Sequence, residues 1–317
     1  MIDLSQKKVE ERYEYFINYL LESAAQIEKI KGENHSFTNI QKEFLLALEI
    51  QIKESRKQLE EAMKSTVWDN LVIAFFGETN AGKSTIIETF RILFEEETRN
   101  KEAIQQGHGI DGLIVGDGQV DFTKVYREYR FSINNKPFTL IDVPGIEGNE
   151  DDFKDEIKNA LNKVHCVFYV HGHNKKPDTA TAEKIKKYLE DWVNVYSIYN
   201  VRGGAENYDE SEERISLLTE EVLKAETLMI ETFKNILGDI YKGNIVVQAL
   251  LAMCSKGNFS PKREDLLRKQ DKLLKYFETA EILFEFSQFN KIIRLVDEKS
   301  ENFKAEIIEA NKQKLLS

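Results

Sequence analysis

The chain of 317 residues is long enough for one large domain or two of ordinary size, with ample apolar content for a core. Its formal net charge of −11 argues against a general nucleic-acid-binding protein, because such proteins carry a basic excess. The two cysteines, Cys166 and Cys254, are far apart in apolar, strand-like runs. We therefore expect buried thiols in a reducing compartment and no disulfide framework.

The beginning of the chain, at Met1, lacks the basic and then apolar order of a signal peptide. No apolar run approaches the length of a transmembrane helix. These features predict a cytoplasmic protein, for which any membrane contact would be peripheral.

Residues 1–66 are expected to form a helical hairpin. The segment 5–65 is helical in pattern and contains no proline, and two apolar stripes run along it at a spacing close to that of a coiled coil. Residues 31–36 between the stripes have turn chemistry, with Ser36 as a helix cap. The stripes have two interpretations, packing against the rest of the chain or self-association. Their members are Val9, Tyr13, Phe16, Leu20, Ala24 and Ile27, then Phe37, Ile40, Phe44, Leu48, Ile52 and Leu59.

Residues 67–258 alternate strand-like and helix-like segments, as a mostly parallel α/β sheet flanked by helices requires. A glycine-rich stretch, residues 105–118, is expected to be a mobile loop. The expected helices begin at Lys83, Asp151, Thr179 and Glu212. The expected strands are Leu71–Phe76, Val125–Ile133, Phe138–Ile141, Val164–Val170, Val193–Tyr199 and Ile245–Leu251.

Residues 259–317 return to a helical pattern. We expect these C-terminal helices to pack with the N-terminal helices into one helical bundle. One predicted helix carries Leu266, Leu267, Leu273, Leu274, Phe277, Leu283 and Phe284, and another carries Phe289, Ile292, Ile293, Val296, Phe303 and Ile307.

The most informative segment is a complete phosphate-binding loop of the form G-x4-G-K-[ST]. It follows the apolar strand Leu71–Phe76 and leads into a predicted helix. The two glycines let the backbone wrap a phosphate with its N–H groups pointing inward, and the following helix adds the positive end of its dipole. The nucleotide-binding residues of this loop are Gly77, Glu78, Thr79, Asn80, Ala81, Gly82, Lys83, Ser84 and Thr85.

A second element, D-x-x-G, follows the strand Phe138–Ile141. Its Asp142 is expected to contact Mg²⁺ through water, and the Gly145 N–H is expected to sense the γ-phosphate. Thr123 stands where GTPases place a switch threonine, although a loop-capping role is the alternative. The metal ligands are then Ser84, Thr123 and Asp142, with Lys83 reaching the β- and γ-phosphates.

The choice of base depends on the loop after the strand Val193–Tyr199. Asn200 is expected to brace the phosphate loop and Arg202 to stack on the purine. A carboxylate usually follows three residues after such an asparagine, but Gly203 stands there, and we considered Glu206 and Asp209 as substitutes. The Ala249 N–H is expected to meet the base edge. On balance we expect GTP and GDP rather than adenine nucleotides.

Catalysis departs from the Ras-like pattern because Ile146 occupies the position of the water-orienting glutamine. An aliphatic side chain cannot position water. Asn80 suggests a K⁺ ion held against the phosphates as the missing cation, with hydrogen bonding within the loop as the alternative. The expected catalytic residues are therefore Lys83, Ser84, Thr123, Asn80 and Gly145.

Three histidines, His108, His171 and His173, invite a metal interpretation. No carboxylate or cysteine stands at a suitable spacing for zinc. We expect histidines at loop ends near the nucleotide.

The loop GETNAGKST, the Asp142–Gly145 element and the helices flanking the nucleotide domain together resemble the dynamin superfamily, and within it the bacterial dynamin-like proteins of the LeoA kind. The stretches Asp111–Gly118 and Tyr199–Gly203 are similar to that group as well. The resemblance covers about residues 67–260 by motif. Many dynamins carry Gln-Ser where this chain has Thr79 and Asn80, and 317 residues leave no room for a long stalk and membrane-inserting tip.

The resemblance implies a P-loop GTPase domain whose Mg²⁺-dependent hydrolysis of GTP is stimulated when two nucleotide-binding faces dimerise. It also implies a neck, built from residues 5–65 and 261–317, that transmits nucleotide-driven movement to a membrane or protein partner. No nucleic acid is expected as a partner. Two alternatives remain open, namely an Era-like translation- or ribosome-associated GTPase and a nucleotide-binding interaction protein with negligible hydrolysis.

Overall fold

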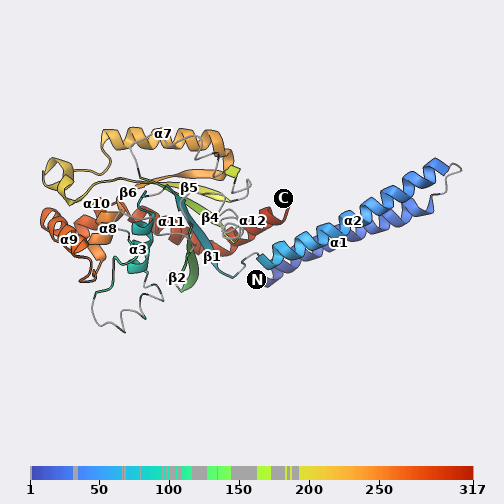
Figure 1. Cartoon of the computed structure of the whole chain (residues 1–317), viewed down its shortest axis with the longest axis horizontal. Coiled ribbons are helices and arrows are strands. Elements are labelled where there is room, and N and C mark those ends of the chain that lie inside the picture. The colour runs from blue at the N-terminus through green and yellow to red at the C-terminus, as the bar shows by residue number, and fades with distance from the viewer. Residues whose placement is uncertain are drawn as a thin grey trace. The chain divides into compact units, whose positions relative to one another are not determined.

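The structure is a computed structural model that describes residues 2–30, 35–65, 67, 69–78, 80–94, 96, 99, 101, 105, 109–115, 127–133, 135–143, 163–172, 183, 186–187 and 193–316. The chain divides into two compact units (Figure 1). The first comprises Met1–Asp69 together with Asn311–Ser317, and the second is Asn70–Ala310.

The first unit contains a hairpin of two long helices, α1 (Ile2–Lys29) and α2 (His35–Ser65), as the apolar stripes predicted. The Gln41 side chain of α2 donates to the carbonyl oxygens of Ile27, in the last turn of α1, and of Ile30, just after that helix. Farther from the turn between the helices, Arg56 of α2 and Glu14 of α1 form an ion pair of 3.1 Å.

The second unit is mixed α/β, with a mostly parallel six-stranded sheet flanked by helices, as predicted. The strand order is β2-β3-β1-β4-β5-β6, and β2 is antiparallel to β3 at one edge. Every residue of the central strand β1 is buried, whereas β2 alternates exposed and buried residues because one of its faces meets solvent. The strands are β1 (Leu71–Gly77), β2 (Arg127–Ile133), β3 (Lys136–Asp142), β4 (Cys166–His171), β5 (Asn194–Asn200) and β6 (Tyr241–Val247).

Helices cover both faces of the sheet (Figure 1). On one face, Phe90 of α3 (Lys83–Leu93) packs against Phe75 of β1 and against Phe289, which precedes α11 (Asn290–Glu301). Residues of α8 (Ala249–Lys256) belong to the same core. On the other face, Phe233 of α7 (Glu220–Leu237) packs against Tyr169 of β4.

Several predicted boundaries shift in the structure. The run expected as one strand, Ile245–Leu251, divides at Gln248, because β6 ends at Val247 and α8 begins at Ala249. Cys254 is therefore helical, although it is buried as expected, and burial raises the pKa of its thiol and that of Cys166 to about 12. Glu212 begins only a short 3₁₀ helix, Glu212–Arg214, and α7 starts later, where Thr219 caps it. The predicted helix starts at Asp151 and Thr179 lie outside the described residues.

The C-terminal helices also differ from the expected arrangement. Residues 259–310 belong to the α/β unit rather than to a bundle with the N-terminal helices. The apolar faces of these helices are buried in that unit, because Leu266, Phe277 and Leu283 pack against α8 and Tyr208. The helices are α9 (Glu264–Phe277), α10 (Ala280–Phe286), α11 and α12 (Phe303–Leu316), the last of which continues into the first unit.

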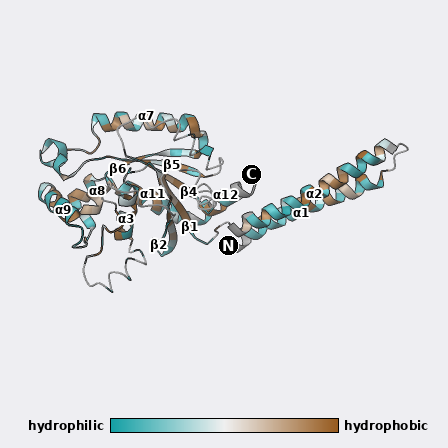
Figure 2. Cartoon of the chain, viewed as in Figure 1, coloured by the Kyte–Doolittle hydropathy of each residue, from teal (hydrophilic) through white to brown (hydrophobic). Residues whose placement is uncertain are grey.

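Hydrophobic residues are dense on the central strands, and they also recur along the two helices of the hairpin (Figure 2), where several of them are exposed. Within the described residues, no helix combines the length and the apolar character needed to cross a bilayer.

Candidate functional site

The phosphate loop lies where the carboxyl ends of the parallel strands meet. The loop leaves β1 at Gly77, which is in register with Val170 of β4, and Asp142 at the end of β3 is in register with Phe75. This edge of a parallel sheet is the usual place for a ligand in open α/β folds. Gly77 is required at the turn, because a Cβ there would lie 2.2 Å from the carbonyl oxygen of Val170.

Two loop residues have left-handed backbone conformations, Asn80 with φ 62° and Gly82 with φ 89°. Asparagine tolerates this region better than most residues, and glycine adopts it without strain. A Cβ at Gly82 would also lie 2.1 Å from the Asn200 amide nitrogen. The backbone thus turns sharply before α3, and the side chain of Asn80 is exposed to solvent. Thr79 lies outside the described residues.

The ammonium group of Lys83 contacts the carboxylate of Asp142. Their side chains are only 8% and 6% exposed, so this is a buried ion pair at the start of α3. A buried charge needs such compensation, and the pair holds Lys83 over the loop. The predicted D-x-x-G aspartate and the loop lysine are therefore neighbours. Gly145, the glycine of the same D-x-x-G element, lies outside the described residues.

The oxygen atoms beside Lys83 suit Mg²⁺. Ser84 is half-buried in the first turn of α3, and Asp142 supplies a buried carboxylate. Mg²⁺ prefers such hard oxygen ligands and takes one or two from the protein, the others coming from water and phosphate. Thr123, the third predicted ligand, lies outside the described residues.

Asn200 braces the site as predicted. Its Nδ2 donates to the carbonyl oxygen of Ala81 in the phosphate loop at 2.8 Å, and its Oδ1 accepts from the Ala249 N–H at 3.0 Å. The predicted role of Ala249 needs correction for this reason. Its N–H is already bonded to Asn200, so it does not point to a base edge.

A cavity of about 210 Å³ lies beside this brace. Asn200 and Arg202 line it, so the residue that braces the loop and the residue predicted to stack on the purine share one cavity. Arg202 is exposed, which leaves its planar guanidinium available for stacking. The other lining residues are Thr85, Val201, Gly203 and Leu250.

A buried pair of side chains beneath the loop was not predicted from the sequence. The Nδ1 atom of His171, at the end of β4, lies 2.8 Å from the Glu78 carboxylate, and the imidazole is almost completely buried. A Cβ at Gly172 would lie 2.7 Å from the Ala81 Cα, so the end of β4 packs directly on the loop. His171 is near the loop as expected. His108 and His173 lie outside the described residues, and no metal-binding group of three His, Cys, Asp or Glu residues is found among those described.

No family model matches the chain, and no curated protein matches it. Solved structures similar to it include the translation elongation factor SelB from Methanococcus maripaludis in complex with a GTP analogue, at 18% identity and a TM-score of 0.35 over 57% of this chain and 30% of that one. Another is a GTP-binding protein from Sulfolobus solfataricus in complex with GDP, at 15% identity and a TM-score of 0.34 over 87% and 66%. The chain spans less than two thirds of either protein's length. Likenesses this weak identify no family, so function is inferred from the chain's own residues.

Replacing Asn200 by Ala should destabilise the α/β unit and weaken nucleotide binding together. The substitution leaves the Ala81 carbonyl and the Ala249 N–H buried without partners, which costs about 2–4 kcal/mol in the free energy of unfolding. Denaturant titration followed by circular dichroism measures this loss. Asn207→Ala is the control, because Asn207 is exposed and accepts one bond, from the Gly204 N–H. Equal losses for both variants would refute the bracing role.

Proposed function

We propose that this protein binds GTP and hydrolyses it to GDP and phosphate with Mg²⁺. The observation that carries the proposal is the buried meeting of Lys83 with Asp142 at the carboxyl end of the sheet, directly above a loop shaped to cradle phosphate. When nucleotide binds, phosphate oxygens can replace the Asp142 carboxylate as the anionic partner of the buried Lys83 ammonium group.

The residues of the loop act by charge and position rather than by covalent chemistry. Backbone N–H groups of Asn80, Gly82 and Lys83 would donate to the phosphate oxygens, whereas those of Glu78 and Ala81 donate to the carbonyl oxygens of Val170 and Glu78. The ammonium group of Lys83 would neutralise the β- and γ-phosphates. Ser84 and Asp142 would hold Mg²⁺, directly and through water respectively, and the bound ion neutralises negative charge on the phosphates. Asn200 fixes the loop in the conformation that these contacts need, so little reorganisation accompanies binding.

Asn80 is proposed to hold a monovalent cation. Its side chain is exposed and its backbone is left-handed, so the amide oxygen is accessible from solvent. We infer that two nucleotide-binding faces dimerise and that K⁺ then supplies the positive charge that Ile146 cannot. Basal turnover by the monomer is correspondingly slow.

Within GTPases we favour a dynamin-like protein that couples its nucleotide state to movement of a helical element. The hairpin supports this proposal. It buries few large apolar side chains, such as Ile17 and Ile52, while Tyr15, Tyr19 and Ile40 are each more than 60% exposed. Exposed apolar residues gathered in this way mark a contact surface, here for a membrane or protein partner. Because α9, α10 and α11 pack on the α/β unit, the proposed neck is reduced to the hairpin and the end of α12.

An Era-like translation-associated GTPase is the second candidate, and the asparagine in the phosphate loop favours it equally. Such a protein needs a basic surface for RNA, whereas this chain carries a net charge of −11. A nucleotide-binding interaction protein without hydrolysis is the third.

Nucleotide binding can be tested by calorimetry with GDP, GTP, ADP and ATP in the presence of Mg²⁺. We expect heat with guanine nucleotides, and Lys83→Ala should weaken binding about 100-fold, because charge-assisted bonds to phosphate are lost. Lys224→Ala removes an exposed lysine from α7 and should change nothing. The proposal fails if no nucleotide gives heat, or if both variants bind as the unmodified chain does.

Hydrolysis per molecule should rise with protein concentration and should be about tenfold faster in KCl than in NaCl. Asn80→Gly is the matched variant, because glycine keeps the left-handed backbone and removes only the amide. It should abolish the difference between the salts and leave GDP affinity nearly unchanged. Turnover that is independent of protein concentration and of the cation would contradict dimerisation with K⁺, and absent phosphate release would favour the third candidate.

Co-sedimentation with liposomes and with RNA separates the first two candidates. Pelleting with liposomes, and its loss in the double variant Phe16→Ser and Ile40→Ser, is expected if the hairpin is a peripheral contact surface. Leu223→Ser on α7 removes a large apolar side chain of comparable exposure and is the control. Strong pelleting with RNA alone would support the Era-like candidate instead.

A further inference from the structure

We propose that Glu206 is the carboxylate that selects guanine. It takes the place of the acidic residue that is usual in the base-reading loop at the position of Gly203. This inference rests on the proposed function, since it assigns the base specificity of that same site. It follows from the conformation of the loop after β5, from the residues that fix this loop, and from the pattern of donors on the purine edge.

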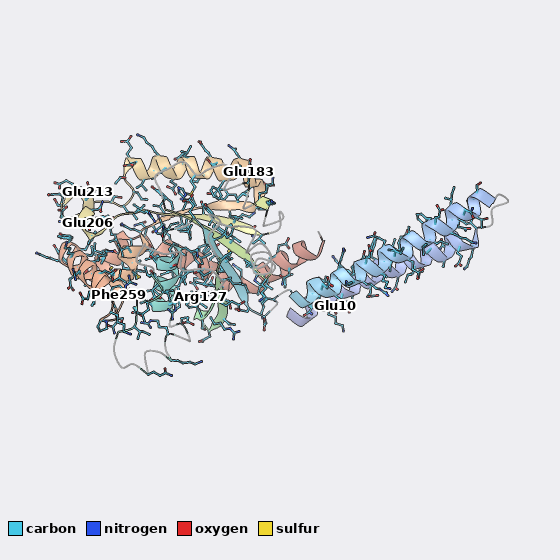
Figure 3. All side chains as sticks on the ribbon, in the orientation of Figure 1. Glu10, Arg127, Glu183, Glu206, Glu213 and Phe259 are labelled. Atoms are coloured by element: carbon cyan, nitrogen blue, oxygen red, sulfur yellow. The ribbon has the colours of Figure 1, made fainter. Side chains whose placement is uncertain are left out.

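Glu206 folds back over the loop to which it belongs. It lies in the short 3₁₀ helix Ala205–Tyr208 (Figure 3). Only Gly204 separates this helix from the cavity-lining Gly203. A Cβ on Gly204 would lie 2.1 Å from one carboxylate oxygen of Glu206 and 2.5 Å from the other. The carboxylate therefore rests against the backbone of Gly204, in the space that a side chain there would fill, one residue from the cavity.

The loop that presents Glu206 is anchored on both sides of it. Ala205 and Tyr208 are buried, and the Tyr208 hydroxyl donates to the Gln248 side chain. On the other side, the Gly204 N–H donates to the Asn207 side-chain oxygen at 2.9 Å. Tyr208 also packs edge-on against Phe277 of α9. The carboxylate is thus carried by a fixed turn, although its own side chain is exposed.

Gln248 connects this turn to the other wall of the cavity. Its Nε2 faces the carbonyl oxygen of Gly203 at 3.5 Å, and its backbone N–H donates to the Ser287 carbonyl at 2.9 Å. The residue after it, Ala249, is bound to Asn200. The two loops that line the cavity are therefore held together through Gln248 and Asn200, which sets the distance between Glu206 and the first turn of α8.

The chemistry of the purine edge makes a carboxylate at this position selective. Guanine presents two adjacent donors, N1–H and the exocyclic N2–H, and one carboxylate accepts from both. Adenine presents an unprotonated N1, which a carboxylate repels. Across the cavity, Leu250 lies in the first turn of α8. The Ala249 N–H in this turn donates to Asn200 and the Leu251 N–H to the Gln248 carbonyl, so the Leu250 N–H is the group that would donate to the guanine O6.

The test is a change of base preference. In Glu206→Gln the amide can donate to the C2 oxygen of xanthine but cannot accept from both donors of guanine. Calorimetry or competition with a fluorescent analogue would compare GDP, ADP and xanthosine diphosphate. We expect the unmodified chain to prefer GDP, and the variant to lose about 100-fold in GDP affinity while gaining affinity for xanthosine diphosphate.

Asp209→Asn is the matched control, because Asp209 is an exposed carboxylate next to the same 3₁₀ helix. A gain of affinity for a new base cannot come from misfolding. Because Glu206 is exposed, the melting temperature of Glu206→Gln should be unchanged. The inference is overturned if Glu206→Gln keeps its preference for GDP, if Asp209→Asn is the variant that switches, or if the unmodified chain binds GDP and ADP equally. Binding of no nucleotide by the unmodified chain would instead remove the proposed function itself.

Discussion

One buried amide holds the site together. The side chain of Asn200 is bonded to the phosphate loop on one side and to the first residue of α8 on the other. Nothing larger than glycine fits at position 82, because the Asn200 nitrogen occupies the space that a side chain there would need. The shape of the loop, the place of Lys83 and the wall of the cavity all depend on this contact between the ends of β1, β5 and β6.

A second set of buried charges fixes the segment 109–115, which precedes the predicted switch threonine. The Glu88 carboxylate of α3 accepts from the Gly112 N–H at 2.5 Å and is paired with Arg91 at 3.1 Å. Burial raises the pKa of this carboxyl, and Arg91 opposes the rise. On the same segment, Asp111 is bonded to Arg99 at 2.7 Å. The stretch expected as one mobile loop is therefore anchored in part, by charged side chains that lie outside it in the sequence, Glu88 and Arg99.

The features that depend on short sequence patterns were predicted correctly. The loop Gly77–Thr85, the strand before it and the partner carboxylate Asp142 follow from spacing alone, and the structure confirms where the described residues of this set lie. The end of β6 was missed because Ile245–Leu251 is apolar throughout, and such a run does not distinguish a buried strand from a buried helix.

The role of Ala249 and the Glu78–His171 pair could not be predicted for a different reason. Both depend on which loop atoms face one another across separate strands, and that is a property of the packed sheet rather than of any segment. The packing partner of the C-terminal helices was predicted wrongly for a similar reason. An apolar stripe shows that a helix is covered, but it does not show what covers it.

The burial of Phe289 also bears on how the chain folds. Its ring contacts Phe90 of α3, close behind the phosphate loop, and Ile292 and Val296 complete the same core. Nearly two hundred residues of chain separate these partners, so a ribosome must release the chain beyond Val296 before the sheet can acquire this internal layer. A fragment ending near the last strand would contain every phosphate-binding residue and still expose an apolar hollow beside them.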